Sequence, residues 1–312
     1  MVSRRLPPAA GATPPAVGTA RVAPTPSGAR RALARRFLRS RRAVVGLALL
    51  LLIALSALAA PAISPAEPQS MNPRVKLVAP LATSRVGTFH ALGTDQVGRD
   101  ILSRIFYGGR VSLGVALVAV VLGGLFGVVV GLFAGYFGGW VDTVTMRLAD
   151  VQLAIPSILL AISIVAFAGR SLGVLLGVLS LAAWIVFART IRGVTLGLKR
   201  TAFVEAARAA GASDIRIIFR HILPNTWTPI IVLGTQQLAL LIILESSLSF
   251  IGAGAPADLP SWGTMVADGR DYILTRAWWL TAFPGLAISL SVLSINFFGD
   301  GLRDVLDPRL RL

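Results

Sequence analysis

Six long apolar runs constrain this chain more than any other feature of its sequence. An α-helix of roughly 20 apolar residues crosses a hydrocarbon core of about 30 Å. Runs near that length occur at Ala43–Ile63, Val111–Ala134, Leu148–Ala168, Leu172–Ala188, Pro229–Gly252 and Ala277–Phe298. Because most are apolar on all sides of the helix, they fit lipid or a buried bundle better than a soluble amphipathic stripe. The sequence predicts an all-α polytopic membrane protein with six transmembrane helices.

The composition narrows the chemistry that the chain can carry out. Hydrophobic residues make up 55% of the chain and charged residues 14%, whereas soluble domains carry about 25% charged residues. There is no cysteine, and the two histidines, His90 and His221, lie far apart in sequence. Disulfides, thiolate nucleophiles and cysteine-bound metals are therefore excluded, and we expect neither a metal site nor a catalytic residue.

The basic residues predict the orientation of the chain in the membrane. If the N-terminus is cytoplasmic, 21 Lys and Arg residues fall on the cytoplasmic side and 9 on the other. Basic residues are retained on the cytoplasmic side, so both termini are expected there. The passage 199–225 is then cytoplasmic, and the segments 64–110 and 253–276 face outward.

The sequence predicts three regions, of which the first is an N-terminal tail. Residues 1–42 are expected to form a disordered basic cytoplasmic tail, residues 43–110 the first span with an external loop, and residues 111–312 a core with five spans. The arginine-rich stretch Arg30–Arg42 is expected to orient the first span and to contact anionic lipid. Nucleic acid is not an expected partner because no aromatic platform accompanies it. The ALAAPA stretch resembles a signal-peptidase site, but its long preceding tail favours an uncleaved anchor.

The passage KRTAFVEAARAAGASDIRIIFRHILPN, residues 199–225, interrupts the apolar runs with two short predicted helices. Thr201 begins the first helix, which runs through Glu205, and Gly211 closes it in a left-handed turn. Ser213 and Asp214 begin the second helix. Pro224 is expected to end it.

The second of these helices carries an apolar face outside the predicted spans. Ile215, Ile218, Phe219 and Ile222 recur at helical spacing and would lie on one side of the helix. Either a partner protein or the ends of the chain's own spans cover this face.

The same passage resembles the EAA loop of ABC importer permeases. That pattern is Glu-Ala-Ala, three residues, Gly, nine residues, Ile, one residue and Leu-Pro; the matching residues here are Glu205, Ala206, Ala207, Gly211, Leu223 and Pro224. His221 stands at the Ile position, in the wording FRHILPN that is familiar from the dipeptide and oligopeptide branch. LGTDQVGRDILSRIFYGGRVSL, GYFGGWVDTVTMRLADVQLAIPS and SWGTMVADGRDYI also resemble that branch. The chain is thus identified as similar to DppC/OppC-type subunits.

The resemblance implies a fold, a mechanism and partners. It implies the type I ABC importer permease fold in a bacterial inner membrane, with residues 111–312 as the permease core. The EAA loop would dock on an ATP-binding subunit, with Glu205 as a polar contact, Ala206 and Ala207 as the small surface, and Gly211 as the hinge. The other implied partners are a second homologous permease and an extracytoplasmic substrate-binding protein.

The energy source is inferred from a motif that the sequence does not contain, and the cargo is inferred from the family resemblance. It contains no G-x-x-x-x-G-K-[ST] phosphate loop, so ATP and Mg²⁺ would be bound by a partner chain. The expected cargo is di- or oligopeptides, with nickel, glutathione or another small solute as the alternative.

Polar residues within the spans are candidates for the translocation pathway. Helical geometry places Glu245 near the face of Gln237 and Ser249, and a carboxylate in a membrane must be paired, protonated or hydrated. The residues leave both a structural hydrogen-bonded role and a pathway role open for Glu245. Ser289 and Asn296 on the last span are weaker candidates. An ion-coupled secondary transporter is the alternative class, and the intact EAA loop argues against it.

Charged residues also cluster in the predicted external segments. Asp95, Arg99, Asp100 and Arg104 alternate in sign, which would brace a short surface helix or contact a binding protein. Asp268, Arg270 and Asp271 leave the same two alternatives.

Overall fold

The computed structural model describes residues 37–38, 40–256, 258–274 and 276–306. Most of the predicted basic tail, residues 1–36, lies outside the described residues. In the described part, five helices are long and apolar enough to cross a membrane, and one bent pair allows a sixth span. The five are α2 (Arg41–Leu58), α4 (Ile101–Phe137), α7 (Leu172–Leu198), α10 (Trp227–Ile251, entered through a helical segment from Asp214) and α12 (Trp279–Leu306). The predicted all-α polytopic class is confirmed.

The third predicted span is not one straight helix. Its residues divide between α5 (Gly139–Leu153) and α6 (Ser157–Ala168), whose axes meet at 87°. The break follows from Pro156, because a proline disfavours helical backbone at the residue before it and cannot donate to a carbonyl one turn earlier. The expectation of one continuous helix over Leu148–Ala168 was therefore wrong, because the helix is broken and bent between Leu153 and Ser157.

Several helices extend beyond the apolar runs that predicted them. α4 begins at Ile101 because the Asp100 carboxylate caps it, accepting from the Ser103 backbone N–H at 2.9 Å. The boundary placed between residues 110 and 111 thus falls inside a helix. α7 continues to Leu198, past the expected end at Ala188.

Glycines allow α4 and α7 to pack closely. Gly123, Gly127 and Gly131 lie on the α7 side of α4, and a Cβ at Gly123 or Gly131 would stand 2.5 Å from an α7 carbonyl oxygen. Side chains larger than hydrogen do not fit at that distance, so the two backbones approach each other through these positions.

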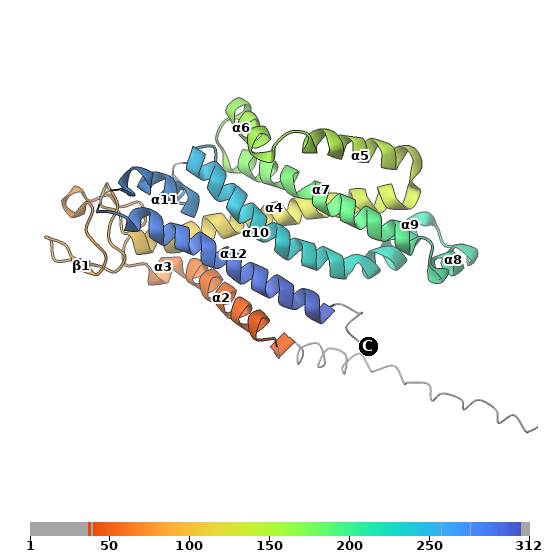
Figure 1. Cartoon of the computed structure of the whole chain (residues 1–312), viewed down its shortest axis with the longest axis horizontal. Helices are drawn as coiled ribbons and strands as arrows, with labels where there is room; N and C mark the ends of the chain where they lie inside the picture. Colours follow the sequence, from red (N-terminus) through yellow and green to blue (C-terminus); the bar gives the residue numbers. More distant parts are fainter. Residues whose placement is uncertain (1–36, 39, 257, 275, 307–312) are drawn as a thin grey trace, which may run out of the picture.

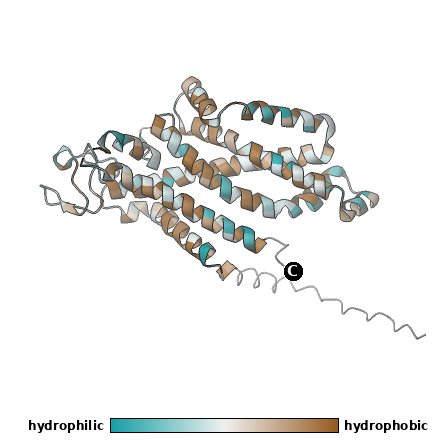
Figure 2. Cartoon of the chain, viewed as in Figure 1, coloured by the Kyte–Doolittle hydropathy of each residue, from teal (hydrophilic) through white to brown (hydrophobic). Residues whose placement is uncertain are grey.

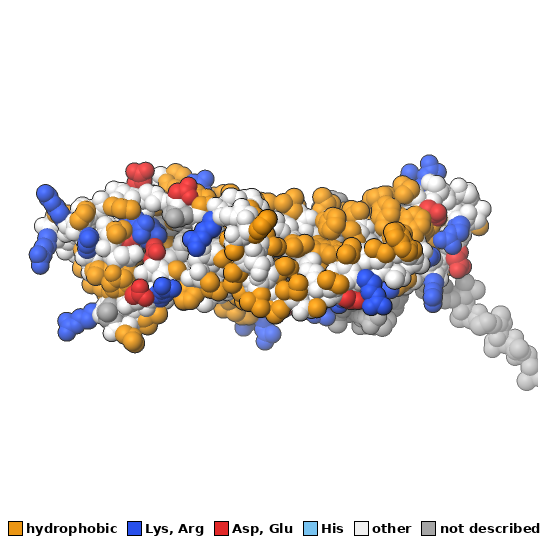
Figure 3. Space-filling view, turned by 90° about the horizontal axis from the view of Figure 1, so that it is seen from above, with side chains coloured by type: hydrophobic (Ala, Val, Ile, Leu, Met, Phe, Trp, Pro, Cys, Tyr) orange, Lys and Arg blue, Asp and Glu red, His pale blue; other side chains and the backbone are white. Residues whose placement is uncertain are grey.

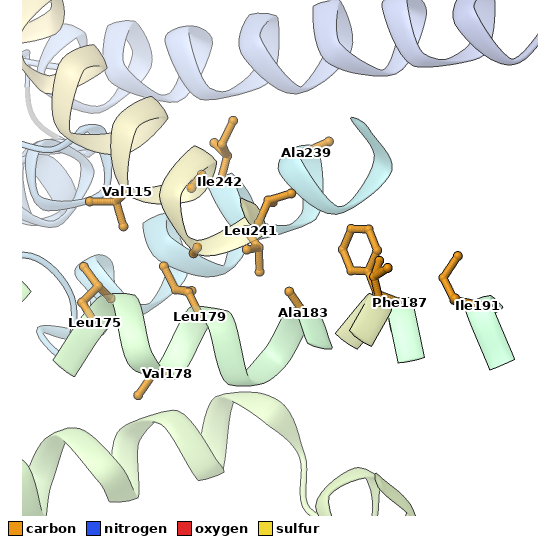
Figure 4. Close-up of a cluster of buried hydrophobic side chains, with 14 of the residues drawn as sticks. Val115, Leu175, Val178, Leu179, Ala183, Phe187, Ile191, Ala239, Leu241 and Ile242 are labelled. Atoms are coloured by element: carbon orange, nitrogen blue, oxygen red, sulfur yellow. The ribbon is translucent and has the colours of Figure 1, made fainter. Parts of the chain in front are cut away.

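The hydrophobic core lies between α4, α7 and α10. Figure 4 shows Leu175, Leu179 and Ala183 of α7 pointing toward α4 and α10, while Val178 points to the other side. Phe187 of α7 is buried beside Gly124 of α4. α12 packs against both α2 and α10, which places the first and last long helices side by side (Figure 1).

The short elements gather at the two ends of the bundle (Figure 1). One end, here the hairpin end, holds α3 (Ala60–Ile63), η1 (Pro73–Val75), β1 (Ala82–Thr83), β2 (Phe89–His90), α11 (Trp262–Gly269) and η4 (Arg270–Tyr272). The opposite end holds α8 (Ala202–Ala209) and α9 (Asp214–Ile217). Hydrophobic residues dominate the long helices (Figure 2), and charged side chains gather mainly at the two ends in Figure 3. This distribution suits a bundle whose middle lies in lipid.

Candidate functional site

The segment that carries the EAA-like residues forms a compact projection at one end of the bundle. We call residues 199–217, which contain α8 and α9, the coupling segment. Val204 is fully buried and anchors α8 to the bundle. Thr201 is the N-cap residue of α8 and Ser213 that of α9, as predicted, although neither side chain forms a capping hydrogen bond.

Gly211 forms the turn between α8 and α9. Its φ is +81°, which suits glycine because a Cβ costs about 1–2 kcal/mol in the left-handed region. The Gly211 N–H donates to the Arg208 carbonyl at 3.0 Å, and the Ala212 N–H donates to the Ala207 carbonyl at 3.1 Å. These two bonds are the Schellman motif that ends a helix. The predicted left-handed turn at Gly211 is confirmed.

Pro224 does not end the second helix, contrary to the prediction. A π-helical turn (Ile218–Ile222) and a 3₁₀ turn (Leu223–Thr226) follow α9 and lead directly into α10. The proline ring would clash with the carbonyl one turn earlier in a regular α-helix, and the wider turn accommodates it. The coupling segment is thus joined to α10 by an unbroken helical path.

The EAA-like residues of α8 are open to solvent. Glu205 and Ala206 are exposed, Ala207 is half-buried, and the Glu205 carboxylate forms no hydrogen bond or ion pair with any described residue. Among the other predicted loop residues, Gly211, Ser213, Asp214 and Pro224 are exposed, and His221 and Leu223 are half-buried. The segment therefore presents an acidic group and a small-residue surface outward.

The apolar face of the second helix is partly buried against the bundle and partly exposed. Ile218 and Ile222 are fully buried against the chain's own helices, whereas Ile215 and Phe219 are 51% and 45% exposed. Phe203 of α8 is also exposed. The chain covers only half of this face, and an exposed apolar patch remains beside the Glu205 helix.

Tyr136, near the end of α4, fastens the coupling segment to the bundle. Its hydroxyl donates to Asp214 Oδ1 at 2.5 Å and accepts from Arg208 Nη2 at 3.2 Å. The Lys199 ammonium donates to the Tyr136 carbonyl oxygen. The hydrogen bond to Tyr136 raises the pKa of Arg208. One side chain of α4 thereby holds residues on both sides of the Gly211 turn.

Glu245 lies at the centre of a buried hydrogen-bond cluster near the hairpin end. Its carboxylate, which is fully buried, accepts from Ser112 Oγ at 3.0 Å and from Ser249 Oγ at 2.7 Å. Ser112 Oγ in turn accepts from the Trp262 backbone N–H at 3.2 Å. The cluster joins α4, α10 and α11, so the structure provides the hydrogen bonds that a buried carboxylate requires.

The other candidate pathway residues lie in different surroundings. Gln237 and Ser249 are buried on α10, as Glu245 is, and the Ser249 hydroxyl donates to the Glu245 carboxylate. Ser289 and Asn296 of α12 are exposed, and the Ser289 hydroxyl donates to the Gly285 carbonyl of its own helix. The structure therefore separates the α10 residues from those of α12.

The charged residues of the hairpin end do not form a surface helix. Asp95 Oδ2 accepts from Arg99 Nε at 2.6 Å and from Arg104 Nη1 at 2.7 Å. Asp268 Oδ2 accepts from the same two arginines at 3.3 and 3.1 Å. Arg104 is 5% exposed and Asp95 is 2% exposed. These groups form a buried network between the start of α4 and α11.

Sequence reasoning missed Tyr136, Ser112 and Trp262. All three fall within segments that resemble the family, which was the available signal. The hydrogen bonds from Tyr136 to Asp214 and from Trp262 to Ser112 span 78 and 150 positions along the chain. Spacing within a helix does not reveal such contacts.

Comparison with known proteins identifies the family of this chain. Residues 127–312 match the model for the binding-protein-dependent transport system inner membrane component, and residues 30–80 match the N-terminal transmembrane domain of oligopeptide transport permease C. The chain belongs to this permease family. The permease is 45% identical over 279 residues to a putative peptide transport system permease protein of Brucella abortus, covering 89% of this chain and 92% of that protein.

Other relatives and one solved structure agree with this membership. The permease is 42% identical to the dipeptide transport system permease protein DppC of Alkalihalophilus pseudofirmus, covering 88% of each chain. It is also 42% identical to the glutathione transport system permease protein GsiD of Pectobacterium atrosepticum, covering 89% of this chain and 90% of that protein. An inward-facing structure of the MetNI methionine ABC transporter aligns with a TM-score of 0.52 and 22% identity, covering 64% of this chain and 95% of that chain. This likeness supports the fold.

Proposed function

We propose that this permease forms half of the translocation pathway of an ATP-driven importer for small peptides. A second, homologous permease supplies the other half, and an extracytoplasmic binding protein delivers the solute. The peptide assignment draws on the names of the relatives, and glutathione is one member of that chemical class. Nickel or another small solute is the alternative cargo.

The coupling segment carries the proposed contact with a separate ATPase. The observation behind it is that Glu205 and Ala206 are exposed and that the Glu205 carboxylate has no hydrogen bond or ion pair with the described residues. Phe203 and Ile215 of the same segment are also exposed. Exposed apolar side chains among polar and charged groups suit a protein interface. ATP and Mg²⁺ are bound by that partner.

The proposed mechanism is alternating access driven from the coupling segment. When the ATPase subunits close, they move α8 and α9. That movement passes to α4 through Tyr136 and to α10 through the unbroken helical path after α9. The bundle then opens toward the other side of the membrane.

We place the coupling segment on the cytoplasmic side of a bacterial inner membrane, with both termini on that side. The excess of basic residues supports this orientation. α2 begins, and α4, α7 and α12 end, at the same end of the bundle as the coupling segment. Figure 1 thus agrees with the predicted alternation of loops.

Co-purification tests the docking proposal. The tagged permease and its Glu205→Arg variant are purified from native membranes after mild cross-linking, and the accompanying chains are identified by mass spectrometry. We expect the wild type to retain an ATP-binding subunit and a second permease. With the variant, the amount of co-purified ATP-binding subunit should fall at least tenfold, and the amount of second permease should stay unchanged.

Glu67→Arg is the matched control, because Glu67 is an exposed glutamate at the opposite end of the bundle. This variant should retain both partners. Equal retention of the ATPase by wild type and Glu205→Arg would contradict docking at α8, and absence of any ATPase would contradict the importer itself.

A further inference from the structure

A polar pocket lies at the hairpin end, away from the coupling segment. It has a volume of about 330 Å³ and is lined by segments that are far apart in sequence; its polar lining includes Gln69, Arg99, Arg104, Arg170, Thr264 and Asp268. Figure 3 shows basic and acidic side chains close together at this end of the molecule. A volume of this size suits a small solute rather than a protein domain.

Two of the pocket's arginines are held in place before any ligand arrives. Arg99 and Arg104 share the carboxylates of Asp95 and Asp268, at distances from 2.6 to 3.3 Å. Arg104 is 5% exposed, and its Nε is buried without a hydrogen-bond partner among the described residues. The ion pairs with Asp95 and Asp268 therefore fix the position of the Arg104 guanidinium at the wall of the pocket.

Arg170 supplies a third guanidinium from the turn between α6 and α7. It is exposed, lines the pocket near Gly252, and forms no ion pair or hydrogen bond with the described residues. The three arginines and the two carboxylates, of Asp95 and Asp268, leave one net positive charge. One negative charge on a ligand would balance it.

We infer that this pocket binds the carboxylate of a small solute, and specifically the C-terminal carboxylate of a short peptide. Guanidinium groups bind carboxylates through paired, charge-assisted hydrogen bonds. The peptide class rests on the proposed function, whereas carboxylate recognition rests on the pocket itself.

The pocket also touches the helix that leaves the coupling segment. Ser249 and Gly252, at the far end of α10, contribute to its lining, and Ser249 donates to the buried Glu245 carboxylate. A ligand in the pocket would therefore contact the same helix that the ATPase is proposed to move.

Binding of two neutral-side-chain probes tests the inference. The full permease, with the subunits that accompany it and free of soluble binding protein, is placed in phosphatidylcholine nanodiscs. Alanyl-alanine and its C-terminal amide are titrated by saturation-transfer NMR. The dipeptide should bind at least tenfold more tightly than the amide, because only the dipeptide carries the carboxylate.

Arg170→Gln is the informative variant, since Arg170 is exposed and its loss leaves the buried network intact. We expect it to lower the affinity for alanyl-alanine at least tenfold and to bring the two probes within about twofold of each other. Arg85→Gln is the matched control, because Arg85 is an exposed arginine at the same end that does not line the pocket. It should bind both probes as the wild type does.

Three outcomes would overturn the inference. These are equal binding of the two probes by the wild type, unchanged binding by Arg170→Gln, and loss of alanyl-alanine binding when phosphatidylglycerol is added to the nanodiscs. The last outcome would assign the pocket to an anionic lipid headgroup. Retention of the ATPase is read separately through Glu205, so failure of the pocket and failure of the importer proposal are distinguishable.

Discussion

Two glutamates at opposite ends of the molecule have opposite surroundings. Glu245 is fully buried and accepts hydrogen bonds from two serines of α4 and α10. Glu205 is exposed on α8 and has no hydrogen bond or ion pair within the described chain. The chain satisfies the buried carboxylate of Glu245 internally, whereas it leaves the Glu205 carboxylate to solvent.

The largest expected effect tests how firmly the hairpin end is held. Asp95→Ala removes the buried carboxylate that both Arg99 and Arg104 contact and should lower the free energy of unfolding by about 3–5 kcal/mol. The two arginines then keep only Asp268, whose side chain is 36% exposed. Equilibrium unfolding in mixed micelles measures this loss of stability. Asp258→Ala, at an exposed position, should change stability by less than about 0.5 kcal/mol. A similar loss in both variants would contradict the structural role of the network.

An intermediate effect is expected where the coupling segment meets the bundle. Tyr136→Phe removes the hydroxyl that lies between Asp214 and Arg208. It should lower the free energy of local opening of the coupling segment by about 1.5–3 kcal/mol, the range for hydrogen bonds to charged groups. Hydrogen exchange of residues 202–217 should accelerate at least tenfold, with the exchange of α7 unchanged. Tyr107→Phe is the control, because no described hydrogen bond uses the Tyr107 hydroxyl. Unchanged exchange in Tyr136→Phe would remove Tyr136 from the proposed transmission route.

The smallest effect separates two roles of Glu245. Glu245→Gln keeps the size of the side chain and one acceptor oxygen, while the serine hydroxyls rotate to suit the amide. We expect a stability change of about 1 kcal/mol and assembly with the partners unchanged. Transport of a labelled dipeptide by reconstituted complexes then distinguishes a structural role of Glu245 from a pathway role. Full transport would mean that the carboxylate is structural, whereas loss of transport in an assembled complex would mean that its charge serves the pathway.

Much of the fold could be predicted from the sequence because span length and helix signals are local. Apolar runs of membrane length located the long helices, and Gly211 marked the turn after α8 through its left-handed backbone. The course of α5 and α6 was not predicted, although Pro156 was visible. Hydropathy reports how apolar a stretch is but carries no information on its direction after a proline.

The helical path through Pro224 is a second place where a local sequence rule predicted the wrong structure, here beside the coupling segment. A proline ordinarily predicts the end of a helix, yet a π turn and a 3₁₀ turn carry the chain through it into α10. Packing of Ile218 and Ile222 against neighbouring helices favours that continuation. Tertiary contacts thus outweighed a local rule.

The sequence by itself determined the class of the protein, the approximate places of the long helices and the position of the coupling segment, because these depend on neighbouring residues along the chain. Only the tertiary structure decided what the charged and polar residues contact. It joined Tyr136 to Asp214, Ser112 to Glu245, and Arg104 to Asp268. Each pair comes from distant segments, and a hydrogen bond depends on distance in space rather than separation in sequence.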